Sequence, residues 1–97
     1  MNVISKKKID KFTKRYANAK TALESWYHEV NSNLVVWKTS SDIKKRYPSA
    51  SFLEKNYVIF NIKGNKYRLV VKVAYNSGIV FIKWIGTHAE YSKKRFP

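Results

Sequence analysis

The sequence contains no cysteine, which excludes disulfide bonds, thiolate metal sites and cysteine nucleophiles. It also lacks any apolar run close to the roughly 18 residues that a membrane-spanning helix needs. The lysines near the N-terminus are not followed by an apolar stretch of signal-peptide length. We therefore expect a cytoplasmic protein with no membrane partner.

Acidic residues are scarce, with six Asp and Glu against 20 Lys and Arg, for a formal net charge of +14. Such a chain repels itself unless a polyanion or an acidic protein segment neutralises it. Nucleic acid is the partner that this charge favours. Charge alone would also fit association with a ribosome or with an anionic membrane surface.

The familiar catalytic signatures are missing as well. There are no paired carboxylates, no glycine-rich phosphate loop before a helix, no His-x₃-His metal spacing and no Gly-x-Ser-x-Gly elbow. Nothing in the pattern calls for a metal or a cofactor, and we expect neither.

The chain has 97 residues, of which 44% are hydrophobic and 15% aromatic. This is enough apolar material for one small core and too little for two. We predict a single domain over residues 1–97, whose basic tail at residues 92–97 is mobile in isolation.

Residues 57–91 form the stretch around which the chain is organised, because they contain three β-rich runs separated by Gly64-Asn65 and Ser77-Gly78. A two-residue loop at Gly64-Asn65 suits a type II′ hairpin, since glycine accepts a positive φ at no steric cost. That loop sets a register in which Asn61 lies opposite Arg68.

A two-residue loop at Ser77-Gly78 would place Lys72 opposite Lys83. Like charges directly across a ladder are destabilising, so this pair indicates a binding surface. A three-residue loop over residues 76–78 would instead turn Lys83 toward the core and leave Trp84 outside. We prefer the two-residue loop because it gives the cleaner core.

Side chains alternate across a strand, so these registers predict two different faces of the sheet. The core face carries Val58, Phe60, Ile62, Tyr67, Leu69, Val71, Val73, Val80, Ile82 and Trp84. The opposite face carries Tyr57, Ile59, Asn61, Arg68, Val70, Lys72, Ala74, Phe81, Lys83, Ile85 and Thr87. The second face mixes apolar groups with three cations, as a binding surface would.

Residues 1–4 are long enough to add an edge strand, and Ser5 is a typical helix N-cap. The helix that follows has a short apolar stripe and a dense basic surface that includes Lys7 and Lys11. This basic surface is either simply solvated or in contact with RNA phosphates. Its first-turn lysines oppose the helix dipole, which favours the second interpretation.

A second helix follows a break for which Asn18 is a plausible cap. Its apolar stripe predicts packing on the sheet and consists of Leu23, Trp26, Tyr27 and Val30. His28 shares this helix, and we assign it no catalytic role. Residues 34–37 form a short strand or an extended linker. Residues 40–42 are predicted to cap a brief helix over residues 43–47 that is stopped by Pro48.

The candidate site combines Arg68 and Asn61 with three residues at the end of the last strand, Thr87, His88 and Tyr91. The predicted register places Arg68 opposite Thr87. Thr87 can also cap a terminal turn, and the i, i+3 spacing puts His88 and Tyr91 on one side of that turn. An imidazole titrates near neutrality and can act as acid or base. A guanidinium stabilises phosphate charge.

These groups suit metal-independent RNA cleavage by Arg68, His88 and Tyr91, in which a 2′-hydroxyl attacks the adjacent phosphate. Tyr91 would donate a hydrogen bond or stack on a base. The alternatives are that Thr87, His88 and Tyr91 only close the C-terminal turn, or that the sheet binds nucleic acid without cutting it. The residues predicted to bind RNA are Asn61, Lys66, Lys72, Lys83, Thr87, Lys7 and Lys11.

The chain resembles the HigB-type mRNA interferase toxins of the RelE/ParE toxin group. The resemblance rests on residues 60–69 (FNIKGNKYRL) combined with residues 87–91 (THAEY). The helical Leu23 and Trp26, the Tyr47-Pro48 step and the overall length match as well. The similarity covers essentially the whole chain.

The resemblance implies a RelE-like α+β fold, with two N-terminal helices packed on a small curved, mainly antiparallel sheet of three to five strands. It also implies the toxin of a type II toxin–antitoxin pair, a ribosome-dependent, metal-free ribonuclease that cleaves translated mRNA. Its partner would be an antitoxin, usually HigA-like with a helix-turn-helix domain. We expect the toxin alone to be monomeric and the complex with the antitoxin to be larger.

The positions that match the family pattern are Asn61, Gly64, Asn65, Arg68, Thr87, His88, Glu90 and Tyr91. The hairpin turn already explains Gly64 and Asn65, so we do not count them as catalytic. Many relatives have Asp directly after the tyrosine, whereas this chain has Ser92. The main alternative function is a non-catalytic binding module, either a basic RNA-binding protein or a toxin relative that targets DNA gyrase.

Overall fold

The computed structural model describes residues 1–96. Pro97, the last residue of the tail predicted to be mobile, lies outside the described residues. The strands are β1 (Asn2–Ile4), β2 (Ser51–Phe52), β3 (Tyr57–Ile62), β4 (Tyr67–Ala74) and β5 (Ile79–Thr87). The α-helices are α1 (Lys6–Arg15), α2 (Lys20–Val30), α3 (Ser40–Arg46) and α4 (His88–Ser92). Short 3₁₀ turns lie at Ala17–Ala19 and Glu54–Asn56.

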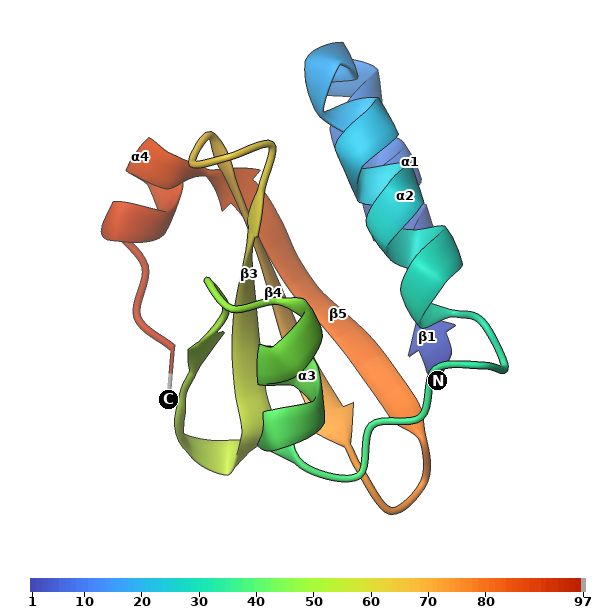
Figure 1. Ribbon diagram of the computed structural model, residues 1–97. Coiled ribbons are helices and arrows are strands. Elements are labelled where there is room, and N and C mark those ends of the chain that lie inside the picture. The colour runs from blue at the N-terminus through green and yellow to red at the C-terminus, as the bar shows by residue number, and fades with distance from the viewer. Residues whose placement is uncertain (97) are drawn as a thin grey trace.

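The strands form one five-stranded sheet in the order β1-β5-β4-β3-β2. β1 runs parallel to β5, and the other pairs are antiparallel. Helices α1 and α2 lie on one side of the sheet and α4 on the other (Figure 1). The predicted α+β fold with two N-terminal helices and an N-terminal edge strand is therefore confirmed. Within residues 1–96, no helix is both long and apolar enough to cross a membrane.

Helix α1 starts where the sequence predicts, but Ser5 does not cap it with its side chain. Ser5 adopts a left-handed conformation with φ +80°, and its carbonyl accepts a hydrogen bond from the Lys8 amide at 2.9 Å. A side-chain N-cap needs an extended backbone at this position, so the predicted cap is wrong. The helix is held by its apolar stripe, in which Ile9 is fully buried and Phe12 packs on Tyr67.

Helix α2 buries Leu23, Trp26 and Val30, as its stripe predicts. Asn18 does not cap it, because a 3₁₀ turn precedes the helix and the Asn18 side-chain oxygen accepts a hydrogen bond from the Tyr67 hydroxyl. This bond fastens the start of α2 to the sheet.

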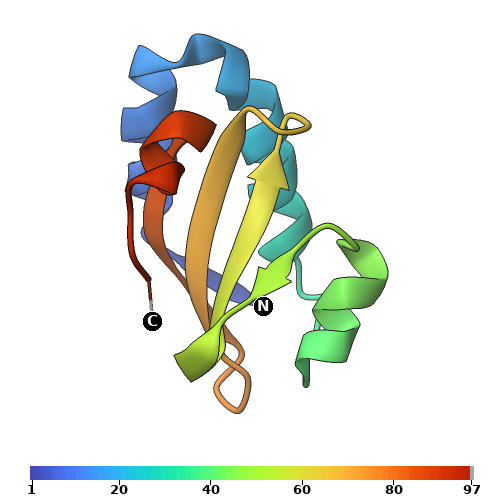
Figure 2. The same cartoon turned by 90° about the vertical axis from the view of Figure 1, so that its left-hand side faces the viewer.

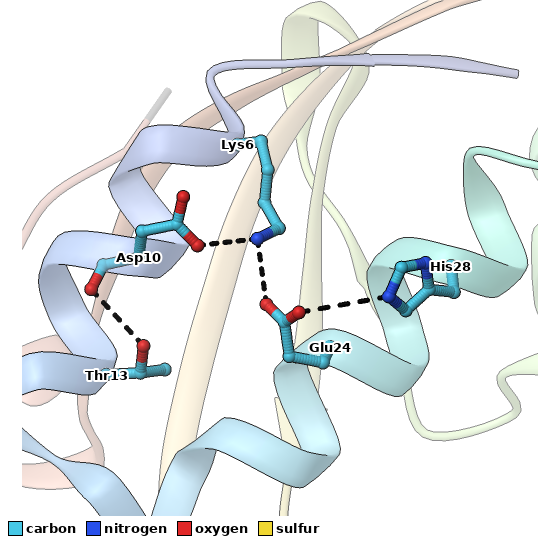
Figure 3. Close-up of polar contacts among 5 residues, drawn as sticks. All are labelled: Lys6, Asp10, Thr13, Glu24 and His28. Atoms are coloured by element: carbon cyan, nitrogen blue, oxygen red, sulfur yellow. Dashed lines mark hydrogen bonds and ion pairs between the residues drawn. The ribbon is translucent and has the colours of Figure 1, made fainter.

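A polar network joins the two N-terminal helices (Figure 3). The Lys6 Nζ lies 2.5 Å from the Asp10 Oδ1 on its own helix and 2.9 Å from the Glu24 Oε2 on α2. The His28 Nε2 lies 3.8 Å from the other Glu24 oxygen, with its side chain 73% exposed. Hydrogen bonds from Lys6 to Asp10 and Glu24 raise the pKa of the lysine.

The sequence leaves open whether the segment after α2 contains a short strand, and the structure decides this. Residues 34–37 form no strand, because Leu34 belongs to a turn and residues 35–37 have no regular secondary structure. Helix α3 is capped by Thr39, whose side chain forms a reciprocal capping box with Asp42. The predicted brief helix is therefore confirmed, with the cap one residue earlier than Ser40, and it ends before Pro48.

Glu29 connects α2 to the end of α3. Its Oε1 accepts a hydrogen bond from the Arg46 Nη2 at 2.7 Å, and its Oε2 accepts one from the Tyr47 hydroxyl at 2.5 Å. Partial burial opposes ionisation of Glu29, but the two hydrogen bonds outweigh it, so the pKa of the carboxyl is lowered. Burial, together with the bond to Glu29, raises the pKa of Tyr47.

The first hairpin has the predicted register. Asn61 lies opposite Arg68, and the six pairs between β3 and β4 follow from the loop centred on Gly64-Asn65. Gly64 has φ +66° and Lys63 before it has φ +53°, so the turn uses two left-handed residues rather than one. Its tightness fixes which residues of β4 face the core.

The second hairpin differs from the prediction. Its loop has four residues, 75–78, and Ala74 pairs with Ile79. Gly78 closes the loop with φ +70°, and its amide donates to the Ala74 carbonyl at 2.9 Å. Lys72 consequently lies opposite Phe81 and not Lys83. The predicted pair of like charges does not exist, so it gives no evidence for a binding surface.

A β-bulge then shifts the register between Val70 and Val71. Val71 pairs with Ile82 but Val70 pairs with Trp84, which leaves Lys83 as the extra residue on β5. A bulge reverses the facing of every later side chain on its strand. Trp84 therefore joins the Arg68 face, and Ile85 packs against the core cluster. Both assignments are opposite to the predicted ones.

The Arg68 face of the sheet carries a second apolar cluster. Ile59 and Val70 are 3% and 0% exposed but lie outside the main core. Phe96 folds back onto the aromatic side chains of this face, with its ring centroid 5.9–6.4 Å from those of Tyr57, Trp84 and Tyr91. Figure 2 shows the tail descending from α4 alongside the sheet. The mobility of the tail stays a prediction.

Candidate functional site

Arg68 is the centre of the site. It is 8% exposed and is the one buried charged residue within residues 1–96. A buried guanidinium is costly unless its donors are satisfied. Nη1 donates to the carbonyls of Asn65 and Tyr67 at 3.1 and 3.3 Å, and Nη2 donates to the Asn65 Oδ1 at 2.9 Å. The turn of the first hairpin thus holds the guanidinium in one orientation.

His88 completes the coordination of this guanidinium. The Arg68 Nη2 lies 2.6 Å from the His88 Nδ1. A guanidinium has donors only, so Nδ1 must be the acceptor and the proton of the neutral ring must lie on Nε2. His88 is exposed. The ring therefore presents an N–H to solvent while its other nitrogen is occupied.

The start of α4 places His88 next to Arg68. Thr87 is the N-cap, as predicted, and forms a capping box with Glu90: the Thr87 amide donates to the Glu90 Oε1 at 2.8 Å, and the Glu90 amide donates to the Thr87 Oγ1 at 3.1 Å. The His88 amide donates to the Lys66 carbonyl at 2.9 Å. Three backbone amides are thus satisfied around the imidazole.

The predicted pairing of Arg68 with Thr87 is wrong, because the four-residue loop and the bulge together bring Gly86 opposite Arg68 and Tyr67 opposite Thr87. A Cβ atom on Gly86 would lie 2.2 Å from the Trp84 ring. The indole therefore lies across Gly86, on the same face as Arg68. This requirement for glycine depends on the bulge, so the sequence pattern did not predict it.

Tyr91 closes the site from one turn further along α4. Its ring centroid lies 6.0 Å from the Arg68 guanidinium carbon and 6.3 Å from the Trp84 ring. A cation beside an aromatic face at this distance is attracted to it. The structure thus brings Arg68, His88 and Tyr91 together.

The residues predicted to bind RNA are spread more widely. The Asn61 Nδ2 donates to the Ser49 carbonyl at 3.2 Å and, within residues 1–96, forms no hydrogen bond with the guanidinium. The ammonium groups of Lys72 and Lys83 lie over Tyr57 and Phe81, at 5.6 and 5.5 Å from the ring centroids. The side chains that remain exposed near the turn or on α1 belong to Lys66, Lys7 and Lys11. Thr87 serves as the helix cap.

Asn65 was expected to serve only the hairpin turn, but it also takes part in the site. The turn explains its position, but its side chain and its carbonyl both accept from Arg68. The Asn-x-x-Arg spacing across a tight hairpin was the signal, because it places the amide within reach of the guanidinium.

The arrangement offers a phosphate one guanidinium, one exposed imidazole N–H and one phenol. These are the groups that bind and stabilise a phosphate with additional negative charge. Within residues 1–96, no three His, Asp or Glu side chains converge in a way that would hold a metal ion.

Comparison with known proteins shows which family the chain resembles. The profile of the HigB toxin family, described as the RelE-like toxic component of a toxin–antitoxin system, matches residues 19–94. The mRNA interferase toxin HigB of Escherichia coli strain K12 is 30% identical over 94 residues, covering 94% of this chain and 88% of that protein. The mRNA interferases HigB of Escherichia coli O157:H7 and Shigella flexneri match with the same identity and coverage. The chain belongs to the HigB family of RelE-like toxins of toxin–antitoxin systems.

Proposed function

We propose that this toxin is an endoribonuclease that cleaves mRNA during translation on the ribosome. The observation that carries the proposal is the 2.6 Å contact between the Arg68 Nη2 and the His88 Nδ1, beside Tyr91. The names of the relatives, which are mRNA interferases, support the same activity. The reaction needs no metal and takes place in the cytoplasm.

In the proposed reaction the 2′-oxygen of one nucleotide forms a bond to the adjacent phosphorus, and the bond from phosphorus to the 5′-oxygen breaks. The products are a 2′,3′-cyclic phosphate and a 5′-hydroxyl. The Arg68 guanidinium stabilises the extra negative charge on the phosphorane-like transition state. Tyr91 donates a hydrogen bond to the phosphate or stacks on a base.

The role of His88 depends on its contact with Arg68. While Nδ1 accepts from the guanidinium, the ring can only donate through Nε2. A phosphate competes for the same Nη2 donor, and its charge makes it the stronger acceptor. Substrate binding would thus release Nδ1, after which the imidazole can accept or deliver a proton. His88 is then the acid or base of the reaction.

The RNA partners are the mRNA and the ribosome. The exposed lysines of α1, including Lys7 and Lys11, would contact RNA phosphates together with Lys66, Lys72 and Lys83. Their side chains act as point charges, so these contacts bind the RNA backbone and do not distinguish between base sequences. Asn61 and Thr87 have structural duties and contribute to RNA binding less directly.

The protein partner is the antitoxin that the family implies, which we propose to be HigA-like with a helix-turn-helix domain. A chain with net charge +14 suits an acidic antitoxin segment. Such a segment would cover the Arg68 site directly or block ribosome entry from a distance. The free toxin is proposed to be a monomer.

The test is induction of the wild-type chain, Arg68→Ala and His88→Ala in a bacterial host, with growth scored and new 5′ ends mapped on a reporter mRNA. A reporter without a start codon measures the dependence on translation. His28→Ala is the matched control, because it removes the other histidine, which is 73% exposed on α2. We expect cleavage by the wild type and by His28→Ala, only on the translated reporter.

Loss of cleavage in Arg68→Ala and His88→Ala, with both variants folded, would support the assignment of the site. Undiminished cleavage in both would contradict that assignment. Growth arrest by the wild type with intact transcripts would contradict the nuclease and favour the non-catalytic alternative, a basic binding module or gyrase-targeting toxin.

A further inference from the structure

A cleft of about 330 Å³ lies between α1 and β5, next to the site described above. Strand β1 pairs with Ile79–Phe81, so within residues 1–96 the later half of β5 has no strand neighbour on that side. Helices α1 and α4 flank this part of β5 from opposite faces of the sheet (Figure 1). The cleft is therefore built from an open sheet edge and two helices.

Four cations line this cleft: Lys8, Lys11, Arg15 and Lys83. Within residues 1–96, none of them forms an ion pair, although Lys6 and Arg46 do. Like charges around one hollow repel each other and lower stability unless an anion occupies it. This clustering indicates a site for phosphate groups.

The apolar part of the lining is mainly aromatic. Phe12 and Tyr16 stack with their ring centroids 4.7 Å apart, and Trp84 on β5, whose ring lies on the Arg68 face of the sheet, also belongs to the lining. The Arg15 guanidinium lies 5.3 Å from the Tyr16 ring centroid. Aromatic faces interleaved with cations are the usual platform for unpaired bases of single-stranded RNA. The occupant that fits is thus a nucleotide, base and phosphate together.

The cleft adjoins the Arg68 site through two residues. Trp84 lines the cleft and also contacts Tyr91, which in turn lies beside Arg68. Glu90 lines the cleft while its Oε1 accepts from the Thr87 amide, directly before His88. A single RNA strand can therefore enter both sites with adjacent nucleotides.

Glu90 is the one acidic residue of the lining. Its Oε1 is used by the capping box, and its Oε2 takes part in no hydrogen bond within residues 1–96. A carboxylate oxygen only accepts hydrogen bonds, so it favours bases with an exocyclic amino group. Adenine and cytosine have such a group and uracil does not.

We propose that the α1–β5 cleft binds the nucleotide next to the scissile phosphate, and that Glu90 selects bases that carry an amino group. The proposal rests on the nuclease function proposed above and adds a specificity site to it. Lys8, Lys11, Arg15 and Lys83 hold the flanking phosphates. The base lies against the aromatic lining, with its edge toward Glu90.

The test measures binding separately from cleavage, with 2′-O-methyl hexanucleotides of A, C or U, which lack the attacking hydroxyl. Tryptophan fluorescence reports stacking on Trp84, because Trp26 and Trp37 are each 4% exposed whereas Trp84 is half-buried. We expect Lys11→Ala and Lys83→Ala each to weaken binding about threefold, and to reduce the slope of log affinity against log salt by about 0.7.

Lys14→Ala is the matched control, because it makes the same charge change on the same helix outside the cleft. It should weaken binding less than Lys11→Ala does. Equal effects of the two substitutions would mean that RNA is attracted diffusely to a basic surface. That result would overturn the proposal that the cleft binds a nucleotide. The proposal would also be overturned if the binding of an acidic peptide depended on Lys11 and Lys83 while the binding of RNA did not.

Glu90→Gln tests base selection without removing the helix cap, because glutamine also serves in a capping box. The substitution replaces the free acceptor by an amide donor. We expect the wild type to prefer A and C over U by about fivefold or more, and the variant to lose or reverse this order. An unchanged order in the variant would overturn the role of Glu90.

The two proposals fail separately. His28→Ala should bind the hexanucleotides as the wild type does, because His28 is exposed on α2 and lies outside the cleft lining. If the wild type shows the expected binding pattern but cleaves no mRNA, the proposed nucleotide site in the cleft is supported and the proposed nuclease activity is contradicted. If the wild type cleaves mRNA but Lys11→Ala and Lys83→Ala bind the hexanucleotides as Lys14→Ala does, the nuclease activity is supported and the nucleotide site in the cleft is contradicted.

Discussion

Arg68 shows how a buried charge is prepared for a ligand. Asn65 and the backbone of the hairpin fix three of its hydrogen bonds, and the fourth, to His88, is the one that a phosphate can replace. Fixed donors stabilise developing charge better than mobile ones because they need no reorganisation. The residues around Arg68 are therefore expected to affect activity more than stability.

Asn65→Ala tests this expectation. The substitution removes one acceptor of the guanidinium, at 2.9 Å, and leaves the carbonyl in place. We expect cleavage to fall roughly 10- to 100-fold because the guanidinium loses its orientation, with a loss of stability of about 1 kcal/mol. Asn33→Ala, at another exposed asparagine, should change neither quantity. Full activity of Asn65→Ala would contradict the positioning role.

Gly86→Ala should destabilise the protein by about 1–3 kcal/mol, because the new methyl group would meet the Trp84 ring at 2.2 Å. Chemical denaturation measures the change. In a Trp84→Ala background the same substitution should cost much less, since the clashing ring is gone. Additive losses in the double variant would contradict this explanation for the glycine.

At the scale of elements, the Glu29 carboxylate links α2 to the end of α3 through Arg46 and Tyr47. The pKa of Glu29 is lowered in the folded protein, where hydrogen bonds outweigh the effect of partial burial. Such a group adds stability above its unfolded pKa, near 4.3, and loses it as the pH falls through its lower folded pKa. The attachment of α3 should weaken in acid.

Glu29→Gln should therefore lower stability at pH 7 and reduce the loss of stability between about pH 5 and pH 3. The free energy of unfolding at several pH values, from urea denaturation, gives both quantities. Glu54→Gln, at an exposed carboxylate in a 3₁₀ turn, is the matched control and should keep the acid sensitivity of the wild type. An unaltered pH dependence in Glu29→Gln would refute the linkage.

At the scale of the whole molecule, most of the six acidic side chains serve internal contacts. Asp10 and Glu24 hold Lys6, Glu29 holds Arg46, and Asp42 and Glu90 belong to capping boxes. Within residues 1–96, only Lys6, Arg46 and His28 lie within ion-pair distance of a carboxylate, so the other cations have no acidic partner there. The excess positive charge makes the free toxin a strong ligand for polyanions and lowers its own stability by repulsion.

The melting temperature should accordingly rise with salt between about 10 and 150 mM, as the Debye length falls from roughly 30 to 8 Å. Calorimetry of the free toxin measures this rise. The double variant Lys7→Glu/Lys14→Glu lowers the net charge of +14 by four units and should show a smaller rise. A melting temperature independent of salt would mean that self-repulsion is negligible.

The sequence by itself determined the parts of the protein that follow from local pattern. The apolar stripe of α2, the register of the first hairpin and the Thr87 cap are present as predicted. Each depends on residues close in sequence or on one tight turn. Steric and hydrogen-bonding preferences decide such features locally.

Only the tertiary structure decided the facing of β5. The four-residue loop and the bulge at Lys83 shift the register, and with it Trp84 moves to the Arg68 face while Ile85 turns to the core. Alternation along a strand fixes relative facing only, and one extra residue reverses it. Packing of both faces at once, against α1 and against the C-terminal aromatic cluster, selects the register, so local pattern could not supply it.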